Sequence, residues 1–536
     1  MKQSIQLASG AIPADAAIPD LVGSVPAAGP RRRTLLLAGV ATLGSLLFGY
    51  DTGVIAGALP YMYLPHAAGG LGLTAVTEGF VTAALALGAA FGAVIGGHIT
   101  DRIGRRSNIL ILALIFVVGT IGCTLAPSVL VLYPFRFILG WAVGGASSTV
   151  PLYLAETAPK HIRGPLVAVD QFMIVFGQFV AFAMNAVIAR VHSGPEAVVQ
   201  TDPSGRYAAG ETVVWDNLKN IAGIVVSAGN GSAWRWMLVL ATIPAVLLWI
   251  GMRLMPESPR WYAANLDFYH AVASLKQVRD DDGEVVDEIR EMAQLRRDED
   301  SRQEEEWSLR HAMRVKWTRK IIVIGVFLGI FDQLTGINTA MWYMPKILHS
   351  AGFSTTDSIT LNVVTGFVSV LGSALGFYFV ARFMRRHVGM CQEAGIVIAL
   401  STLAALFAFG IQPHMTADGE ILSSIPLWIP WAVLVVVSLF VFIKQAGTVH
   451  WILLSEIFPA KIRGASQGVC VGALWLFNGI VAFIFPVMMA TLGGAWTYLM
   501  FAAFNVVAFL FYWKVVPETK IYSLEEIEEK LEARYS

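Results

Sequence analysis

Asp51 is a carboxylate inside a long apolar run that covers residues 34–60. An isolated charge at the centre of a bilayer costs at least about 2.5 to 3.5 kcal/mol, so such a residue usually faces a cavity and has a function. Arg136, in the apolar run over 129–154, is the candidate counter-ion. Burial favours the neutral acid and a nearby cation favours the carboxylate, so this pair could bind and release a proton. The alternative interpretation is a permanent structural ion pair.

Carboxamide side chains form a second group of polar residues within apolar runs. Gln171 and Gln178 are seven residues apart and therefore lie on one face of a helix. Gln333 and Asn338 flank Gly336 in a later run. An amide both donates and accepts hydrogen bonds, which suits contact with vicinal hydroxyl groups. The competing interpretation for each amide is a hydrogen bond between two packed helices.

The composition indicates that lipid is the main solvent of this chain. Of the 536 residues, 56% are hydrophobic and only 14% are charged, against about 25% charged in ordinary globular proteins. The mean hydropathy is +0.62. A net charge of zero gives no basic surface for a nucleic acid. Cys123, Cys391 and Cys470 lack metal-ligand or disulfide spacing, so we expect no metal and no cofactor.

Apolar runs of about 20 residues are long enough to cross a hydrocarbon core of about 30 Å. Twelve such runs predict an all-α membrane protein with twelve transmembrane helices. They cover residues 34–60, 79–100, 108–126, 129–154, 165–190, 236–255, 321–348, 359–384, 390–411, 425–455, 465–492 and 496–516.

Lys and Arg concentrate in every second connection, and retained positive charge marks cytoplasmic loops. We therefore expect a multi-pass protein of the plasma membrane (the cell inner membrane) with both termini in the cytoplasm. The charges that support this orientation are Arg31, Arg32, Arg33, Arg102, Arg105, Arg106, Lys160, Arg163, Arg382, Arg385, Arg386, Lys461 and Arg463.

The soluble segments divide the chain into predicted domains. Residues 1–33 are rich in Ala, Pro and Gly and are expected to be a disordered cytoplasmic N-terminus. A six-helix bundle over 34–255 carries an outside loop at 191–233. The charged segment 256–320 is expected to be a cytoplasmic helical linker before a second six-helix bundle over 321–516 and a cytoplasmic tail over 517–536.

The two halves resemble each other. ETAPKHIRG at 156–164 returns as EIFPAKIRG at 456–464, and the Thr-Gly pair at 52–53 returns at 335–336. The Arg pair at 105–106 returns at 385–386. Such a repeat predicts two pseudo-symmetric six-helix bundles with a site between them, which is the arrangement of a secondary transporter.

The ordered motifs resemble the sugar porter family of the major facilitator superfamily. They are GYDTGVIAGAL at 49–59, DRIGRR at 101–106, the run RFILGWAVGGAS that begins at Arg136, PLYLAETAPKHIRG at 151–164, PESPRW at 256–261, QLTGIN at 333–338, SEIFPAKIRG at 455–464 and PETK at 517–520. This resemblance implies proton-coupled symport of a monosaccharide or cyclic polyol such as a hexose, a pentose or myo-inositol. The expected partners are this sugar, a proton and the lipid bilayer.

The resemblance also implies roles for individual residues. Asp51 and Arg136 correspond to the coupling pair of proton-driven members, whereas facilitators generally have an uncharged residue at the Asp position. The positions implied to bind substrate are Phe48, Gln171, Gln178, Asp332, Gln333, Asn338, Trp342, Gly447, Trp451 and Trp475. A cytoplasmic gate of ion pairs is implied for Arg102, Arg105, Glu156 with Arg163, Glu257 with Arg260, Arg385, and Glu456 with Arg463.

Departures from the family pattern alter the expected pocket, and one of them is the lack of a Gly-Pro bend before Trp451, where residues 447–450 read GTVH. Asp332 stands where many relatives have Gln, and Leu474 stands where many have an amide before Trp475. Lys444 is an unusual charge in the tenth span. We hypothesise that Asp332 and Lys444 pair across the cavity; the alternative is that Lys444 extends to the outer surface.

Other functions lack their required motifs in this sequence. There is no nucleophile elbow, HExxH motif or P-loop, so hydrolysis and ATP-driven transport are not expected and the chain is not an enzyme. The closest rival is a sugar facilitator without proton coupling. A nutrient sensor built on the same fold is a weaker alternative.

Overall fold

Twelve helices or helix pairs long enough to cross a membrane make up most of the part of the chain described by the computed structural model. The structure describes residues 11–30, 34–159, 162–301, 312–415, 425–459, 462–522 and 524–535. The twelve-span helical membrane fold predicted from the sequence is confirmed, and the structure is mostly rather than entirely helical. Of the charges used to orient the chain, Arg31, Arg32, Arg33, Lys160 and Lys461 lie outside the described residues.

The first six spans are formed by α3–α4, α5, α6, α7, α8 and α10–α11, and the second six by α16–α17, α18, α19, α20–α21, α22 and α23. Their bounds are α3 Thr34–Ala41, α4 Leu43–Met62, α5 Ala75–Ile103, α6 Arg105–Leu125, α7 Val129–Thr157, α8 Arg163–Val191, α10 Ala233–Val239, α11 Thr242–Arg253, α16 Lys316–Leu334, α17 Ile337–Ser350, α18 Thr355–Arg382, α19 Arg385–Ala405 with the π-helical turn η3 Leu406–Ile411 and the turn η4 Gln412–His414, α20 Trp428–Ala446, α21 His450–Glu456, α22 Arg463–Thr491 and α23 Gly493–Lys514.

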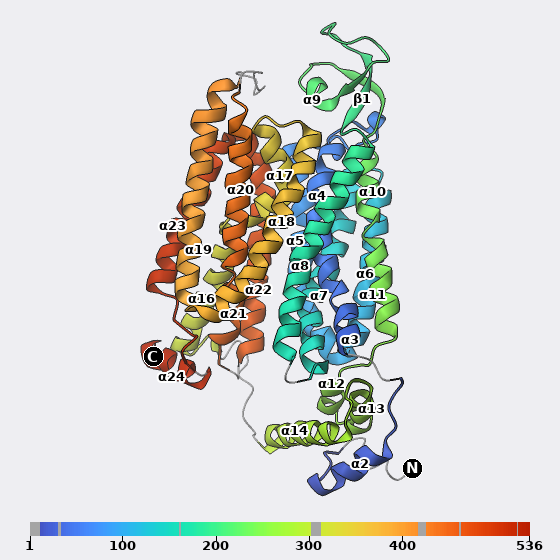
Figure 1. The fold of residues 1–536 in the computed structure, drawn as a ribbon, viewed down its shortest axis with the longest axis vertical. Helices are drawn as coiled ribbons and strands as arrows, with labels where there is room; N and C mark the ends of the chain where they lie inside the picture. The colour runs from blue at the N-terminus through green and yellow to red at the C-terminus, as the bar shows by residue number, and fades with distance from the viewer. Residues whose placement is uncertain are drawn as a thin grey trace.

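The two sets of six spans stand side by side, and α17, α18 and α22 of the second set lie toward the first (Figure 1). Helix α5 packs on α22 and α8 packs on α18 across this boundary. We call the end that carries both termini the linker end, and the opposite end the sheet end.

Glycines allow the closest helix contacts within the first half. A Cβ atom at Gly140 of α7 would lie 2.0 Å from the backbone oxygen of Leu85 in α5, and one at Gly144 would lie 2.0 Å from that of Ala89. Small residues four apart let two backbones approach in lipid, where dispersion rather than water exclusion drives helix association. Helices α4 and α8 contact α7 of this closely packed pair.

Two spans of the second half are interrupted near their centres. The seventh span breaks at Thr335 and Gly336, where Gly336 has a φ of +82° that other residues rarely adopt. The tenth span breaks between the end of α20 at Ala446 and the start of α21 at His450. Broken helices at bilayer depth expose polar backbone and side chains where a cavity can receive them.

The linker end is covered by α12 Pro259–Ala264, α13 Phe268–Val278 and α14 Asp282–Ser301. The turn η1 Asp15–Ala17 and helix α2 Ile18–Ser24 pack against them, with Ile18 and Val22 buried in one cluster with Phe268 and Leu275. The expectation of disorder is therefore wrong for residues 11–30, because a few apolar side chains find a partner surface that composition does not reveal. The tail contains helix α24 Leu524–Tyr535.

The segment expected as an outside loop is a small folded unit at the sheet end (Figure 1). Within residues 191–233, strands β1 Glu196–Thr201, β2 Thr212–Val214 and β3 Val225–Gly229 form an antiparallel sheet in the order β2-β1-β3. Glu196 faces Val214 and Ala197 faces Gly229. The short helix α9 Trp215–Leu218 follows β2, and the turn η2 His66–Ala68 lies against the unit.

Candidate functional site

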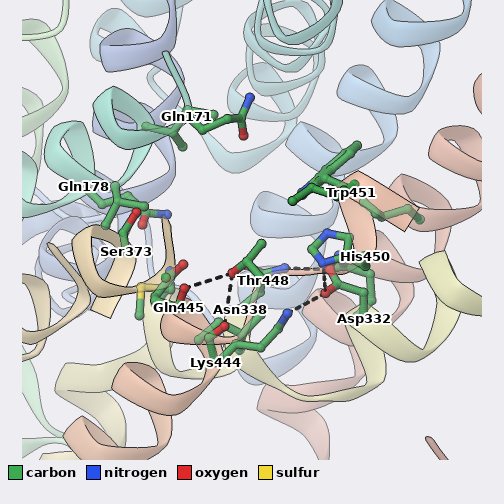
Figure 2. Close-up of a pocket in the computed structure, with 18 of the residues that line it drawn as sticks. Gln171, Gln178, Asp332, Asn338, Ser373, Lys444, Gln445, Thr448, His450 and Trp451 are labelled. Atoms are coloured by element: carbon green, nitrogen blue, oxygen red, sulfur yellow. Dashed lines mark hydrogen bonds and ion pairs between the residues drawn. The ribbon is translucent and has the colours of Figure 1, made fainter. Parts of the chain in front are cut away.

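A cavity of about 550 Å³ lies between the two halves. Helices α4 and α8 form one wall, and α16, α17, α18, α20, α21 and α22 form the other. Gln171 and Gln178 project from the first wall toward Asp332, Lys444 and His450 on the second (Figure 2). The cavity extends toward the linker end, where Ala381 and Arg385 line it.

Nearly all the predicted substrate positions line this cavity. They are Phe48, Gln171, Gln178, Asp332, Gln333, Asn338, Trp342, Trp451 and Trp475. Gly447 is the exception: it is not on the cavity wall, and a Cβ atom there would lie 2.4 Å from Oε1 of Gln392. Its position allows α20 to end against α19, so Gly447 shapes the break rather than contacting a ligand.

An amide network fixes the polar groups of the second wall. Nδ2 of Asn338 donates to Oε1 of Gln333 over 2.7 Å, and Nδ2 of Asn478 donates to the same oxygen over 3.0 Å. Nε2 of Gln333 donates to Oδ2 of Asp332 over 2.9 Å. Because each bond fixes which end of an amide donates, the network presents its remaining donors and acceptors in one set orientation. The sequence analysis did not identify Asn478.

Several buried polar atoms on the cavity-lining residues have no hydrogen-bond partner among the described residues. They are Nε1 of Trp342, Nε1 of Trp475, Oδ1 of Asn478 and Nε2 of His450. A buried donor or acceptor without a partner costs about 1–3 kcal/mol. A ligand with several hydroxyl groups would satisfy these atoms and recover that free energy.

The first wall combines an amide with an aromatic contact across the halves. Nε2 of Gln178 donates to the hydroxyl of Thr52 over 3.2 Å, so this Gln makes the helix contact and also faces the cavity. The rings of Phe48 and Trp475 are 5.7 Å apart at an angle of 45°. This pair joins α4 to α22 beside the cavity and offers apolar ring surface to the C–H faces of a ligand.

Asp51 and Arg136 form a buried ion pair inside the first half. Nη1 of Arg136 lies 3.2 Å from Oδ1 of Asp51, and both side chains are about 1–2% exposed. Oδ2 of Asp51 has no hydrogen-bond partner in the described part of the chain. Asp51 does not line the cavity, contrary to the general expectation for an intramembrane charge. The next residue, Thr52, lines the cavity, so helix α4 connects the ion pair to the cavity wall.

A second ionic cluster forms at the two broken spans (Figure 2). Nζ of Lys444 lies 2.5 Å from Oδ1 of Asp332, and Nδ1 of His450 lies 2.9 Å from the same oxygen. Lys444 therefore points into the protein and pairs with Asp332, and the alternative in which it extends to the outer surface does not occur in this structure.

Comparison with known proteins places this arrangement in a family. The model of the family described as "Sugar (and other) transporter" matches residues 37–531. The chain belongs to the sugar transporter family. It is 39% identical over 503 residues to the major myo-inositol transporter IolT of Bacillus subtilis (strain 168), with 94% of each chain covered. It is 33% identical over 502 residues to the galactose-proton symporter of Escherichia coli (strain K12), covering 93% of this chain and 94% of the relative.

The structure is similar to an inward-open structure of the xylose transporter XylE from E. coli. The TM-score is 0.69 and the sequences are 29% identical, with 94% of this chain and 100% of that chain covered. The resemblance to the sugar porters of the major facilitator superfamily is confirmed, and the protein is a membrane transporter rather than an enzyme.

The sheet end of the transporter is sealed by contacts between the halves. Nζ of Lys346 in α17 lies 2.6 Å from Oε2 of Glu78 in α5, and the hydroxyl of Tyr63 donates to the same carboxylate. Tyr343 and Thr82 share a hydrogen bond of 2.6 Å between their hydroxyls. These contacts close the end opposite the one toward which the cavity extends.

The sheet unit adds a contact on the same side. It belongs to the first half, but Asp216 of α9 lies 3.4 Å from Nε2 of His349 in α17 and accepts a hydrogen bond from the hydroxyl of Thr355 in α18. Burial acts to raise the pKa of the Asp216 carboxyl, but the His349 ring and the Lys219 ammonium outweigh it, and the net pKa lies below its usual value. The ionised carboxylate therefore holds the unit on the second half.

At the linker end, the gate residues pair within each half. Glu156 pairs with Arg105 at 2.9 Å, and Glu456 pairs with Arg385 at 2.5 Å. Among the described side chains, no ion pair joins Glu156 to Arg163. Each of these two carboxylates is therefore held by an arginine of its own half.

The remaining gate residues also lack the predicted partners. Glu257 accepts hydrogen bonds from the backbone N–H groups of Arg106 and Ser107 rather than pairing with Arg260 within the described region. Arg102 is exposed. The Arg463 side chain lies outside the described residues.

The sequence analysis missed three buried acids. Glu78 is the anion of the sheet-end seal, Asp170 of α8 accepts a hydrogen bond of 2.5 Å from Ser45, and Glu393 lies in α19. All three are 1–2% exposed. A signal was available, because Asp170 and Glu393 lie inside or beside predicted spans just as Asp51 does, but neither belongs to a motif.

Proposed function

We propose that this transporter is a proton-coupled symporter of a monosaccharide or cyclic polyol such as a hexose, a pentose or myo-inositol. It works by alternating access in the plasma membrane, with the linker end and both termini in the cytoplasm. The orientation is supported by the described arginines that gather at the linker end, including Arg105, Arg106, Arg385 and Arg386. The structure then corresponds to the inward-facing state.

The observation that carries the proposal is the buried pair of Asp51 and Arg136. Leaving one charge of such a pair alone costs about 3–5 kcal/mol, so the pair responds strongly to a proton. Protonation at the unpartnered Oδ2 of Asp51 neutralises the carboxylate and weakens its hold on Arg136 in α7. Helix α4 carries Phe48 and Thr52 to the cavity, so this change reaches the substrate side.

The energy available from one proton is enough for substantial accumulation. One elementary charge moved through 100 mV supplies about 2.3 kcal/mol, which corresponds to roughly fiftyfold accumulation at one proton per sugar. The seal of Glu78 and Lys346 and the gate pairs at the linker end need to supply only a few kcal/mol to bias the two conformations.

The substrate class is supported by the cavity and by two relatives. Amides, indole N–H groups and aromatic rings line a space of about 550 Å³, which suits one small polyhydroxylated ring. One relative is named a myo-inositol transporter and another a galactose-proton symporter. Both names lie within the proposed class.

The test is uptake into proteoliposomes of labelled myo-inositol, glucose, galactose and xylose, with and without an inward proton gradient. The wild type should accumulate at least one of them only with the gradient, and Asp51→Asn should exchange that sugar without accumulating it. Asp170→Asn is the matched control, because it removes an equally buried acid whose hydrogen bond is with Ser45; it should still accumulate. Equal gradient-independent equilibration by wild type and Asp51→Asn would identify a facilitator instead.

A further inference from the structure

Glu393 completes a group of ionisable residues in the second half, far in the sequence from Asp51 and Arg136. Lys444 of α20, His450 of α21 and Glu393 of α19 are buried, and the side chain of Asp332 of α16 is only 8% exposed. Tyr512 of α23 lies within electrostatic reach of Glu393 and Asp332, and Arg385 of α19 pairs with Glu456. The cluster therefore contains two acids and one lysine as its main charges.

Asp332 and Glu393 differ in the number of hydrogen-bond partners that their carboxyl groups have. Oδ1 of Asp332 contacts Nζ of Lys444 and Nδ1 of His450, and Oδ2 accepts a hydrogen bond from Gln333. Both oxygens of this carboxylate therefore have polar partners. Oε2 of Glu393 has no hydrogen-bond partner among the described residues, and its Oε1 has only a long contact of 3.5 Å from Nε2 of Gln392. A carboxylate that is 2% exposed with so little compensation is costly, so Glu393 is the acid that holds a proton.

The charge balance of the cluster also indicates that one of its acids holds a proton. With both acids ionised and His450 neutral, the one lysine would leave the cluster with a net charge of −1 at bilayer depth. One bound proton makes the cluster neutral. Because Glu393 interacts electrostatically with Lys444, loss of that proton creates a second anion that competes with Asp332 for the lysine.

Competition for Lys444 affects the residues that line the cavity. Lys444 donates a hydrogen bond to Asp332, and Asp332 accepts another from Gln333. The side-chain oxygen of Gln333 in turn accepts hydrogen bonds from Asn338 and Asn478. Lys444, Asp332 and these three amide residues all line the cavity. When Glu393 is protonated, Lys444 remains on Asp332 and the amides keep their arrangement.

We propose that Glu393 is a second exchangeable proton site, in the half of the transporter opposite Asp51, and that its proton favours sugar binding through Lys444 and Asp332. The carboxyl takes up one proton from solvent and returns it to solvent, and the carboxylate that remains then draws Lys444 away. Glu393 acts through its neighbours and is a positioning residue, not a sugar ligand. The coupling to sugar rests on the proposed function, but the proton site itself does not.

The first experiment detects the proton without any sugar. Infrared difference spectra between pH 6 and pH 9 of the protein in lipid, in an Asp51→Asn background, resolve the carbonyl stretch of protonated carboxyl groups. A component lost at high pH should be absent in Glu393→Gln. An identical difference spectrum in Glu393→Gln would overturn the proton site.

The second experiment measures sugar affinity in the same background, with myo-inositol and D-glucose as probes. Coupling of typical strength should weaken binding about fivefold or more from pH 6 to pH 9. Glu393→Gln, which resembles the protonated acid, should bind tightly at both pH values. Asp357→Asn, at an exposed acid in the first turn of α18, should keep the pH dependence of its parent.

Each result separates the two proposals. If Glu393→Gln keeps the pH-dependent loss of affinity, the coupling role of Glu393 is wrong. If no probe binds at any pH although the infrared component is lost in Glu393→Gln, the proton site holds and the proposed substrate class is contradicted.

Discussion

Replacing Lys444 by Met tests the ionic cluster at the cavity wall directly. The two side chains of the Lys444–Asp332 pair are only 5% and 8% exposed, so the substitution leaves a buried carboxylate. Removing one partner of a buried pair costs about 3–5 kcal/mol. Asp332 keeps His450 and Gln333, which places the expected loss near the lower end, at about 3 kcal/mol.

A double-mutant cycle isolates the interaction from other effects of the substitution. Asp332→Asn combined with Lys444→Met removes both charges at similar volume, and such neutral replacements are often close to neutral in stability. The double variant should therefore be more stable than Lys444→Met, with an interaction energy of about 2 kcal/mol or more. Reversible unfolding in mixed lipid and detergent micelles, with SDS as denaturant, gives the four free energies.

Lys514→Met is the control for the substitution of Lys444. Lys514→Met removes an exposed lysine from the end of α23 and should change stability by no more than about 0.5 kcal/mol. If Lys444→Met behaves like this control, transports normally and shows an interaction energy below about 0.5 kcal/mol, then the contact between Lys444 and Asp332 does not organise the site.

Three further predictions follow from the same structure. Lys346→Met removes the cation of the sheet-end seal and should lengthen spin-label distances between the halves at that end; unchanged distances would show that the ion pair with Glu78 does not hold the seal. Asn478→Ala removes a partner of Gln333 and should weaken myo-inositol binding about tenfold in equilibrium dialysis, whereas unchanged affinity would exclude this amide from the site. The pKa of Asp216 is lowered, so its contact with the second half should persist at neutral pH and be lost only as the pH falls below the ordinary carboxyl range. Limited proteolysis of the sheet unit should therefore be slow at pH 7 and faster at about pH 3 or in Asp216→Asn, and equal rates would contradict this contact.

The membrane spans could be predicted because crossing a bilayer demands about 20 apolar residues, and few soluble segments meet this demand. The interruptions at Gly336 and Gly447 could not be placed with the same rule, since hydropathy continues across them. The sheet unit was missed because β1 is short and lies among turn-forming residues, and its stability comes from contacts with η2 and the second half.

The candidate site was predictable where spacing alone decides the face of a helix. Gln171 and Gln178 line one wall because residues seven apart share a face. The pairing of Lys444 with Asp332, 112 residues away in the sequence, could be predicted only through the family resemblance, which brings the seventh and tenth spans to one cavity. Glu78, Asp170 and Glu393 are acids in or beside apolar runs, as Asp51 is. Only their packing distinguishes the anion of the seal, the partner of Ser45 and the acid with an unpartnered Oε2.

The central claim is that sugar and proton move together through the pair of Asp51 and Arg136. The most direct measurement is the pH of a weakly buffered medium around sugar-free proteoliposomes after addition of the sugar that the wild type accumulates, with no imposed gradient. The account predicts that sugar entry makes the medium more alkaline for the wild type and for Asp170→Asn, and that Asp51→Asn gives no change although the sugar still exchanges. Sugar entry without any change of pH in the wild type would contradict the account.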